Sequence, residues 1–353
     1  MPGVVIYKER RFSTTGGMLG LLLLALFAGG SALRGLRLRP RQRDVSSLHA
    51  SLFSMDTLAA VNAELLAVRE EKTLGEMGSL TKCSVSTLSN KASAVSRLLE
   101  LEGALSVGKV LSPETCEELK EFINAENLRC EERCDAGFPA ELLFGGVNCR
   151  GDRKRKYGIR RDLFMPASST VVFRAMGEVL NNLRPMLEVA VGPDAMIHEI
   201  SSVVSDPTSS RQCIHADTIV LPCPQYPDAS MLPLYTIFVA LQDVEEGMGH
   251  TVYLPRTHTE SAHLLWNACE RSENNKMAFL AKQKAVQSAL KIGDCAIFDS
   301  RVLHAGRENS SDKRRILFYV TISRQQNWPL PDGLHGSNSI RQEDRWKWKL
   351  SAF

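Results

Sequence analysis

The second half of the sequence consists of short strand-like segments with few helical stretches between them. Segments that alternate or run apolar occupy residues 197–205, 211–221, 234–244, 251–254, 291–299 and 314–323. Turn-forming residues such as Asp206-Pro207 and Gly293-Asp294 separate them. One long helical insertion, expected at about 261–290, interrupts the series. This arrangement predicts an antiparallel sandwich or barrel rather than a parallel doubly wound sheet.

The last of these segments carries an arginine inside a strand pattern. Strict alternation puts Arg315, Tyr319 and Thr321 on one face of the strand. The apolar residues on the other face are Ile316, Phe318, Val320 and Ile322. A guanidinium taken out of water is costly unless it meets an anion. We therefore expect Arg315 to hold the carboxylate of a cosubstrate and the nearby His304 to hold a metal; a loop histidine and an ordinary strand-end arginine are the alternative.

A second histidine lies two residues before an aspartate, in His215-Ala216-Asp217. At this spacing on an extended backbone, both side chains leave the same face. Together with His304 they give two imidazoles and one carboxylate, the ligand set of non-haem Fe(II) oxygenases, which leaves metal positions open for a cosubstrate and oxygen. The tripeptide alone is common by chance, so the case depends on the spacing of the whole pattern.

The N-terminal residues 1–55 are expected to form a targeting or membrane-anchor segment. Positions 12–33 carry no charge and are flanked by basic residues on both sides. Such a stretch predicts either a single membrane span or a cleaved signal peptide. If it spans, the larger basic cluster after it favours a cytoplasmic-facing body. The Arg- and Ser-rich residues up to Met55 suggest an alternative, a two-part plastid address of signal and transit peptide.

The remaining chain divides into three parts. Residues 56–104 predict a linker or helical stalk, with a helical hairpin docked on the domain as the alternative. The catalytic domain is expected over 105–325 and a C-terminal tail over 326–353. Within the domain, Ser112 and Pro113 predict a helix start. A second helix is expected from about 169 to 183, ending before Pro185.

Three further features limit the functional classes. A net charge of +3 is too small to suggest a nucleic-acid partner. Nine cysteines without a repeating spacing do not form a disulfide framework, and Cys130 and Cys134 lack the second pair that a zinc set needs. The basic stretch 150–161 is expected to be a solvated loop, with a lip over an acidic substrate as the alternative.

Several motifs together resemble the phytanoyl-CoA dioxygenase family. His304, Asn309, Ser311 and Arg315 match the signature H-x4-N-x-[ST]-x3-R. The blocks 240–244 and 248–258 look like the family's "aLqDv" and "nGpt.flPGSH" sequences, and Ile292-Gly293-Asp294 resembles its "pGD" turn. The resemblance covers roughly residues 110–323.

The resemblance implies a fold and a site. The fold would be mainly β with flanking helices, a double-stranded β-helix or jelly roll. His215, Asp217 and His304 would be the catalytic iron ligands, Arg315 the clamp on the distal carboxylate of 2-oxoglutarate, and Ser311 an added hydroxyl donor. The expected chemistry is O2-dependent decarboxylation of 2-oxoglutarate to succinate and CO2, coupled to hydroxylation of a small or lipid-like molecule. Ascorbate is a candidate reductant.

Two residues distinguish this sequence from related enzymes that act on other substrates or catalyse other reactions. Arg314 stands ten residues after His304, where prolyl 4-hydroxylases use lysine, and this disfavours a peptidyl-proline substrate. Asp217 occupies the position that halogenating relatives leave without a carboxylate, so halogenation is not expected. Two other interpretations stay open: a peptidyl hydroxylase of the secretory pathway, and a catalytically silent, membrane-anchored jelly-roll binding module.

Overall fold

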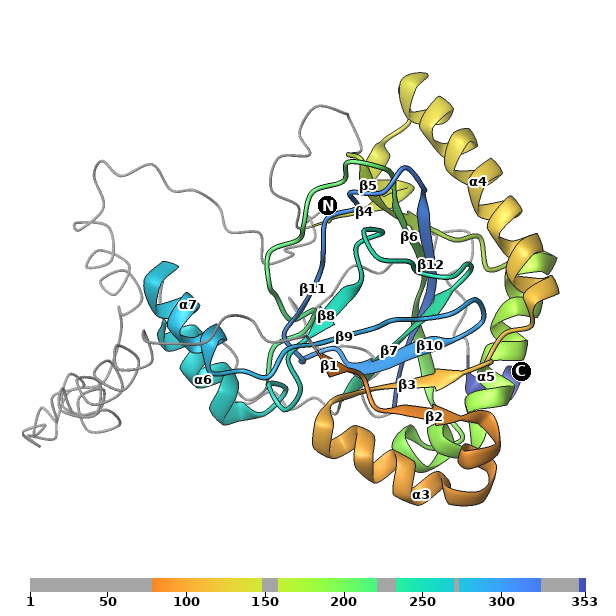
Figure 1. The fold of residues 1–353 in the computed structure, drawn as a ribbon. Coiled ribbons are helices and arrows are strands. Elements are labelled where there is room, and N and C mark those ends of the chain that lie inside the picture. The colour runs from red at the N-terminus through yellow and green to blue at the C-terminus, as the bar shows by residue number, and fades with distance from the viewer. Residues whose placement is uncertain (1–77, 148–157, 221–232, 270–272, 325–348) are drawn as a thin grey trace, which may run out of the picture.

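Two β-sheets face each other and form the centre of the domain (Figure 1). The computed structural model describes residues 78–147, 158–220, 233–269, 273–324 and 349–353. The main sheet has the strand order β2-β3-β10-β7-β12-β6-β5-β4, and the small sheet has the order β1-β9-β8-β11. From β6 onward the chain passes repeatedly from one sheet to the other, as in β7 to β8, β10 to β11 and β11 to β12. This is the jelly roll that the sequence predicted.

The main sheet has more and longer strands than the small sheet. The main-sheet strands are β2 Lys82–Ser84, β3 Ala104–Gly108, β4 Phe144–Gly145, β5 Arg160–Phe164, β6 Met196–Ser205, β7 Leu234–Ala240, β10 Cys295–Asp299 and β12 Arg315–Ser323. The small-sheet strands are β1 Gly78–Ser79, β8 Thr251–Tyr253, β9 Val286–Gln287 and β11 His304–Gly306. The long strand β12 pairs antiparallel with both β6 and β7, so it lies in the middle of the main sheet.

Helices cover the side of the main sheet that faces away from the small sheet (Figure 1). They are α3 Val85–Glu102, α4 Pro113–Asp135 and α5 Thr170–Val191, while α6 Glu260–Ala268 and α7 Glu273–Ala281 lie apart beside the small sheet. The predicted start of α4 is confirmed, since the Ser112 hydroxyl accepts from the Thr115 backbone N–H at 3.3 Å and Pro113 occupies the first turn. The predicted end of α5 was wrong. Pro185 lies inside that helix, which continues because Met186, Leu187 and Val191 are buried in the same core.

Two other expected elements differ from the structure. The helical insertion expected at 261–290 is two short helices followed by β9, because residues 286–287 pair with the small sheet. Within the described part of the segment 211–221, single bridge residues occur at Gln212 and at His215, which pairs with His304, and no regular strand forms.

The described part of the predicted linker, residues 78–104, packs onto the domain. Helix α3 buries Leu88 and Leu99, and β2 pairs with β3, which in turn pairs with β10. The structure over these residues therefore differs from a free stalk and is closer to the docked alternative.

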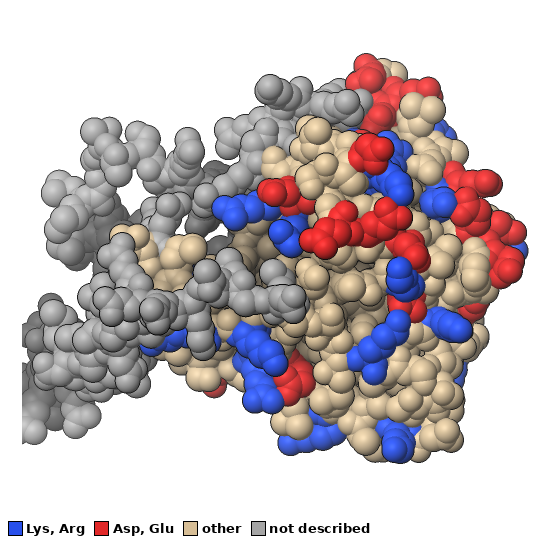
Figure 2. Space-filling model, viewed as in Figure 1, with Lys and Arg blue, Asp and Glu red and all other residues tan. Residues whose placement is uncertain are grey.

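The segment 1–55 and most of the tail 326–353 lie outside the described residues, so the predictions for them stay predictions. Within the described ranges, none of the helices combines the length and apolar character needed to cross a bilayer. Figure 2 shows acidic side chains gathered over the region of α4 and basic ones interspersed across the rest of that face.

Candidate metal centre

Three of the predicted site residues meet at one point. Side-chain atoms of His215, Asp217 and His304 that could bind a metal all lie within 4.8 Å of one another. Nε2 of His215 is 3.5 Å from Asp217 Oδ1, and Nε2 of His304 is 3.7 Å from the same oxygen. No other group of three or more such residues was found in the described part of the chain.

Local backbone pairing brings these residues together. His304 is the first residue of β11, which pairs with β8, and on its other side its backbone exchanges two hydrogen bonds with that of His215, at 2.8 and 3.0 Å. Asp217 follows two residues after His215, and its backbone N–H donates to Ser300 O at 2.8 Å. An extended segment beside β11 is therefore enough to bring His215 and Asp217 next to His304, although this segment is not a regular strand.

Hydrogen bonds within the site fix which nitrogen of each histidine faces the cluster. His215 Nδ1 lies 2.7 Å from Cys213 O, and His304 Nδ1 lies 2.9 Å from Val302 O. A carbonyl oxygen can only accept, so each Nδ1 carries the proton and donates. The lone pair on each Nε2 is left for a metal, as is usual for histidine ligands whose other nitrogen is held by a carbonyl.

Burial keeps both imidazoles neutral. Desolvation lowers the pKa of His304 to about 4 and lowers that of His215 as well, with the neighbouring His304 contributing to the second effect. Neutral imidazole is the form that binds a metal. Burial raises the pKa of the Asp217 carboxyl, with His215 opposing the rise. Even so, 37% of the Asp217 side chain reaches solvent against 4% for His304, so the cluster is open on the Asp217 side.

The fourth predicted residue, Arg315, is buried in the barrel interior with an exposed fraction of 1%. It is the first residue of β12, and its guanidinium donates to Gly249 O and, at 3.1 Å, to Ser205 Oγ. The structure therefore supplies a hydroxyl neighbour other than Ser311. The Ser311 hydroxyl is engaged in the turn before β12, where it contacts Asn309 Oδ1 at 2.6 Å and Lys313 O at 3.2 Å.

Sequence reasoning missed two interior residues on β5. Arg160 was placed in a solvated loop, but the loop prediction was wrong for its last residues: Arg160 and Arg161 lie in a strand with exposed fractions of 2% and 1%. Arg160 donates to Ser205 Oγ at 3.0 Å and to Gly306 O at 3.1 Å. An added Cβ at Gly306 would lie 2.6 Å from Arg160 Nη1 and 2.7 Å from Gln212 Oε1, so a larger residue there would have to displace the ends of these two side chains.

The other missed residue is Asp162, which is buried beside Tyr319 and Ser201. Its Oδ1 accepts from Ser201 Oγ at 2.5 Å and from the Tyr319 hydroxyl at 3.0 Å. Burial raises the pKa of Asp162 to about 6, although these two hydrogen bonds oppose the rise. The alternation Arg160, Asp162, Phe164 was a signal that the sequence contained, but the basic residues before it masked it.

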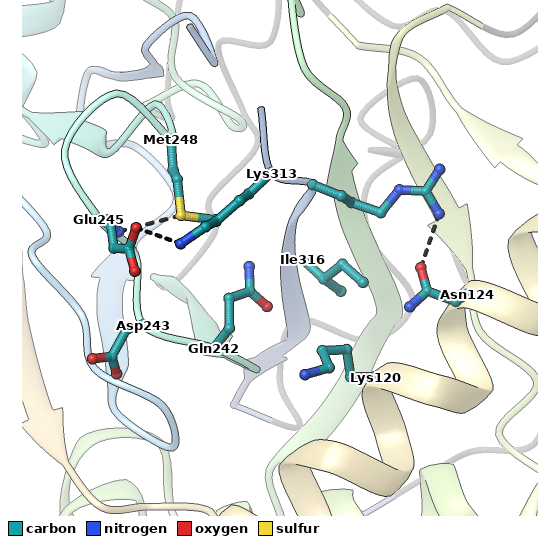
Figure 3. Close-up of a pocket in the computed structure, with 9 residues that line it drawn as sticks. Lys120, Asn124, Gln242, Asp243, Glu245, Met248, Lys313 and Ile316 are labelled. Carbon is teal, nitrogen blue, oxygen red and sulfur yellow. Dashed lines mark hydrogen bonds and ion pairs between the residues drawn. The ribbon is translucent and has the colours of Figure 1, made fainter. Parts of the chain in front are cut away.

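A separate surface cavity lies at the start of β12, beside α4. It has a volume of about 310 Å³ and is lined by polar and charged side chains together with Ile316. Figure 3 shows Gln242 pointing between Lys313, Ile316 and Lys120. Lys313 pairs with Glu245 at 2.8 Å and Lys120 with Glu117 at 2.6 Å. The cavity is not lined by the histidines and Asp217, and we assign it no chemistry.

The residues present fit an iron and 2-oxoglutarate site. Two neutral imidazoles with free Nε2 atoms and one carboxylate form a facial set for Fe(II), which leaves positions open for other ligands. Arg315 provides a buried fork-shaped cation in the same interior.

Comparisons with known proteins agree with the motifs. The family model described as Phytanoyl-CoA dioxygenase (PhyH) matches residues 99–317, which is more than half of the chain. A comparison with curated proteins gave no significant match.

Solved structures with a similar fold have low sequence identity. The epimerase SnoN from nogalamycin biosynthesis is 15% identical, with 67% of this chain and 84% of that chain covered and a TM-score of 0.45. HygX from Streptomyces hygroscopicus, with nickel and 2-oxoglutarate bound, is 16% identical (65% and 85% covered, TM-score 0.47). AviO1 from Streptomyces viridochromogenes is 16% identical (68% and 98% covered, TM-score 0.48). At TM-scores below 0.5, these similarities do not bear on the chemistry of this chain.

Proposed function

This chain belongs to the phytanoyl-CoA dioxygenase family, non-haem iron enzymes that depend on 2-oxoglutarate, and from that premise we propose that it hydroxylates a small or lipid-like molecule and releases succinate and CO2. The observation that carries the proposal is the complete cluster of His215, Asp217 and His304, in the same interior as the buried Arg315. Iron together with 2-oxoglutarate and O2 supplies the oxidising chemistry when bound.

The protein's own residues would hold and orient these groups. His215, Asp217 and His304 would bind the iron, and their backbone-anchored Nδ1 atoms keep the two rings from turning. Arg315 would bind the distal carboxylate of 2-oxoglutarate through its fork of N–H donors. The interior position of Arg315 would exclude water from that ion pair and so strengthen it.

Two alternatives are less well supported. A peptidyl-proline hydroxylase would use lysine at position 314, but Arg314 is engaged with Asp206 at 2.5 Å and Asn124 at 2.8 Å. A catalytically silent binding module would have no need of a complete ligand set. No observation on the described residues favours either.

Succinate release tests the proposal. The full-length protein with Fe(II), ascorbate, O2 and 2-oxoglutarate is expected to release succinate slowly even without a substrate, and candidate small acyl substrates should raise that rate. Replacing both His215 and Asp217 by Ala removes two of the three ligands, so succinate release should fall to background. The matched control is His263→Ala, which removes a histidine that bonds Arg301 O outside the cluster. Unchanged release in the double variant would contradict the site, and equal stimulation by peptides would favour the peptidyl alternative.

A further inference from the structure

One buried polar atom in the barrel interior is unexplained by the protein's own contacts. Tyr253 is fully buried, and its hydroxyl meets the geometry of a hydrogen bond with none of the described residues, although the Thr251 side chain is close enough to lower its pKa slightly. Buried polar groups are nearly always paired, because a buried donor without an acceptor loses the hydrogen bonds that it would make to water in the unfolded chain. A phenol in this position is therefore expected to meet an acceptor that is not one of these side chains.

The strand pairing places this phenol next to the metal cluster. Tyr253 lies directly opposite His304 in the β8–β11 ladder, so the two side chains project to the same face. Their rings are nearly parallel, at 25°, with centroids 6.0 Å apart. The Tyr253 ring also contacts Phe298 of the main sheet, with centroids 5.1 Å apart. The Tyr253 ring is therefore held between the imidazole of His304 and the main sheet.

The charged groups around the phenol are those expected at the two ends of 2-oxoglutarate. The guanidinium of Arg315 donates to Gly249 O, two residues before the start of β8, so it reaches the strand that carries Tyr253. Burial raises the pKa of Tyr253, with the Asp217 carboxylate adding to the rise and Arg315 opposing it. The hydroxyl is thus a neutral donor at pH 7 that lies in the field of both residues.

We propose that the Tyr253 hydroxyl donates a hydrogen bond to the distal carboxylate of 2-oxoglutarate beside Arg315, an inference that rests on the proposed function. A carboxylate has about four lone-pair sites, so it can accept from the phenol and from a bidentate arginine together. The reach of Arg315 to Gly249 O, beside the strand that carries Tyr253, favours the distal carboxylate over the end that faces the metal. Tyr253 is accordingly a cosubstrate-positioning residue.

Binding of two ligands to Ni(II)-loaded full-length protein tests this assignment by calorimetry, without turnover. One ligand is 2-oxoglutarate, and the other is 2-oxopentanoate, which has a methyl group in place of the distal carboxylate. Tyr253→Phe removes only the hydroxyl and should weaken 2-oxoglutarate binding about 10- to 100-fold, the range for a hydrogen bond to a charged group. Its affinity for 2-oxopentanoate should equal that of the wild type.

The control is Tyr235→Phe, which removes a phenol from β7 in the core on the other side of the main sheet and should leave both affinities unchanged. The melting temperature of Tyr253→Phe without ligand should match or exceed the wild-type value, because the hydroxyl has no protein partner to lose. Equal 2-oxoglutarate binding by Tyr253→Phe and wild type would overturn the inference alone. An equal loss for both ligands would overturn the distal assignment, and absence of 2-oxoglutarate binding by the wild type would overturn the proposed function as well.

Discussion

The two faces of strand β12 show how one strand serves stability and chemistry at once. The face toward the helices carries Ile316, Phe318, Val320 and Ile322, none more than 2% exposed, and all lie in the core beneath α3, α4 and α5. The face toward the barrel interior carries Arg315, Leu317, Tyr319 and Thr321, which are buried almost as deeply. Burial alone therefore does not separate the two faces, although their chemistry differs.

The interior face is polar and is held by hydrogen bonds across neighbouring strands. Arg315 bonds Ser205 at 3.1 Å, Tyr319 bonds Asp162 at 3.0 Å, and Thr321 bonds Glu199 at 2.5 Å. Such groups add little net stability, because each bond replaces one made to water in the unfolded chain. The apolar face stabilises the fold through area removed from water. The face toward the helices, the outer face, therefore determines stability, and under the proposed function the face toward the barrel interior, the inner face, determines ligand binding.

A substitution on the outer face should produce the largest loss of stability. Phe318→Ala removes a fully buried ring and should lower the free energy of unfolding by about 4 kcal/mol, measured by urea denaturation. Metal and 2-oxoglutarate affinities of the remaining folded protein should be nearly unchanged. Leu128→Ala on α4, where the side chain is 57% exposed, is the control and should change stability by less than about 0.5 kcal/mol. A loss of metal binding in folded Phe318→Ala would contradict the proposal that the outer face contributes to stability and not to ligand binding.

A substitution on the inner face should produce the reverse pattern. Arg315→Met removes the buried cation and should weaken 2-oxoglutarate binding by on the order of 3 kcal/mol, while Ni(II) binding stays nearly the same. The adjacent Arg314→Met is a sharp control, because that side chain points to the other side and pairs with Asp206. Calorimetry on both variants checks the prediction. If Arg314→Met weakened 2-oxoglutarate binding more than Arg315→Met, the carboxylate clamp would be assigned to the wrong residue.

The difference between the two faces of β12 could be predicted from the sequence because it follows from the alternation of side chains along a strand. The alternation in 315–322 separated the two faces of β12 correctly, and the spacing in His215-Ala216-Asp217 was enough to place both side chains on one side. The start of α4 followed from Ser112 and Pro113, whose capping roles are local. These features are determined within a few residues of the chain.

The features that were missed depend on distant pairing. The alternation of Arg160, Asp162 and Phe164 is too short to reveal that this strand pairs with β6, so the basic residues before it suggested a loop. Pro185 usually ends a helix, but burial of Met186 and Leu187 in the shared core carries α5 past it. The partner of the Tyr253 hydroxyl is equally invisible in the sequence, because it depends on what faces β8 across the barrel.

The buried carboxyl of Asp162 gives the inner face a pH dependence that the outer face cannot have. In the folded protein the pKa of Asp162 is raised to about 6, against an ordinary value of 3.8. Between these values the unfolded chain loses its proton while the folded chain keeps it, so this group's contribution to stability is complete below pH 3.8 and is lost as pH rises through 6. Asp162→Asn removes the charge, so the variant should gain about 1–3 kcal/mol relative to wild type between about pH 4 and about pH 7.

Urea denaturation of the metal-free protein at the two pH values measures this difference. The control is Asp243→Asn. Bonds to the Ile292 N–H and to Lys291 lower the pKa of the exposed Asp243 carboxyl, so wild type should gain stability relative to this variant as pH rises, the opposite sign. If Asp162→Asn followed the wild-type pH profile, the Asp162 carboxyl would lose its proton over the same pH range in the folded and the unfolded chain, and the inner face would owe no pH dependence to it.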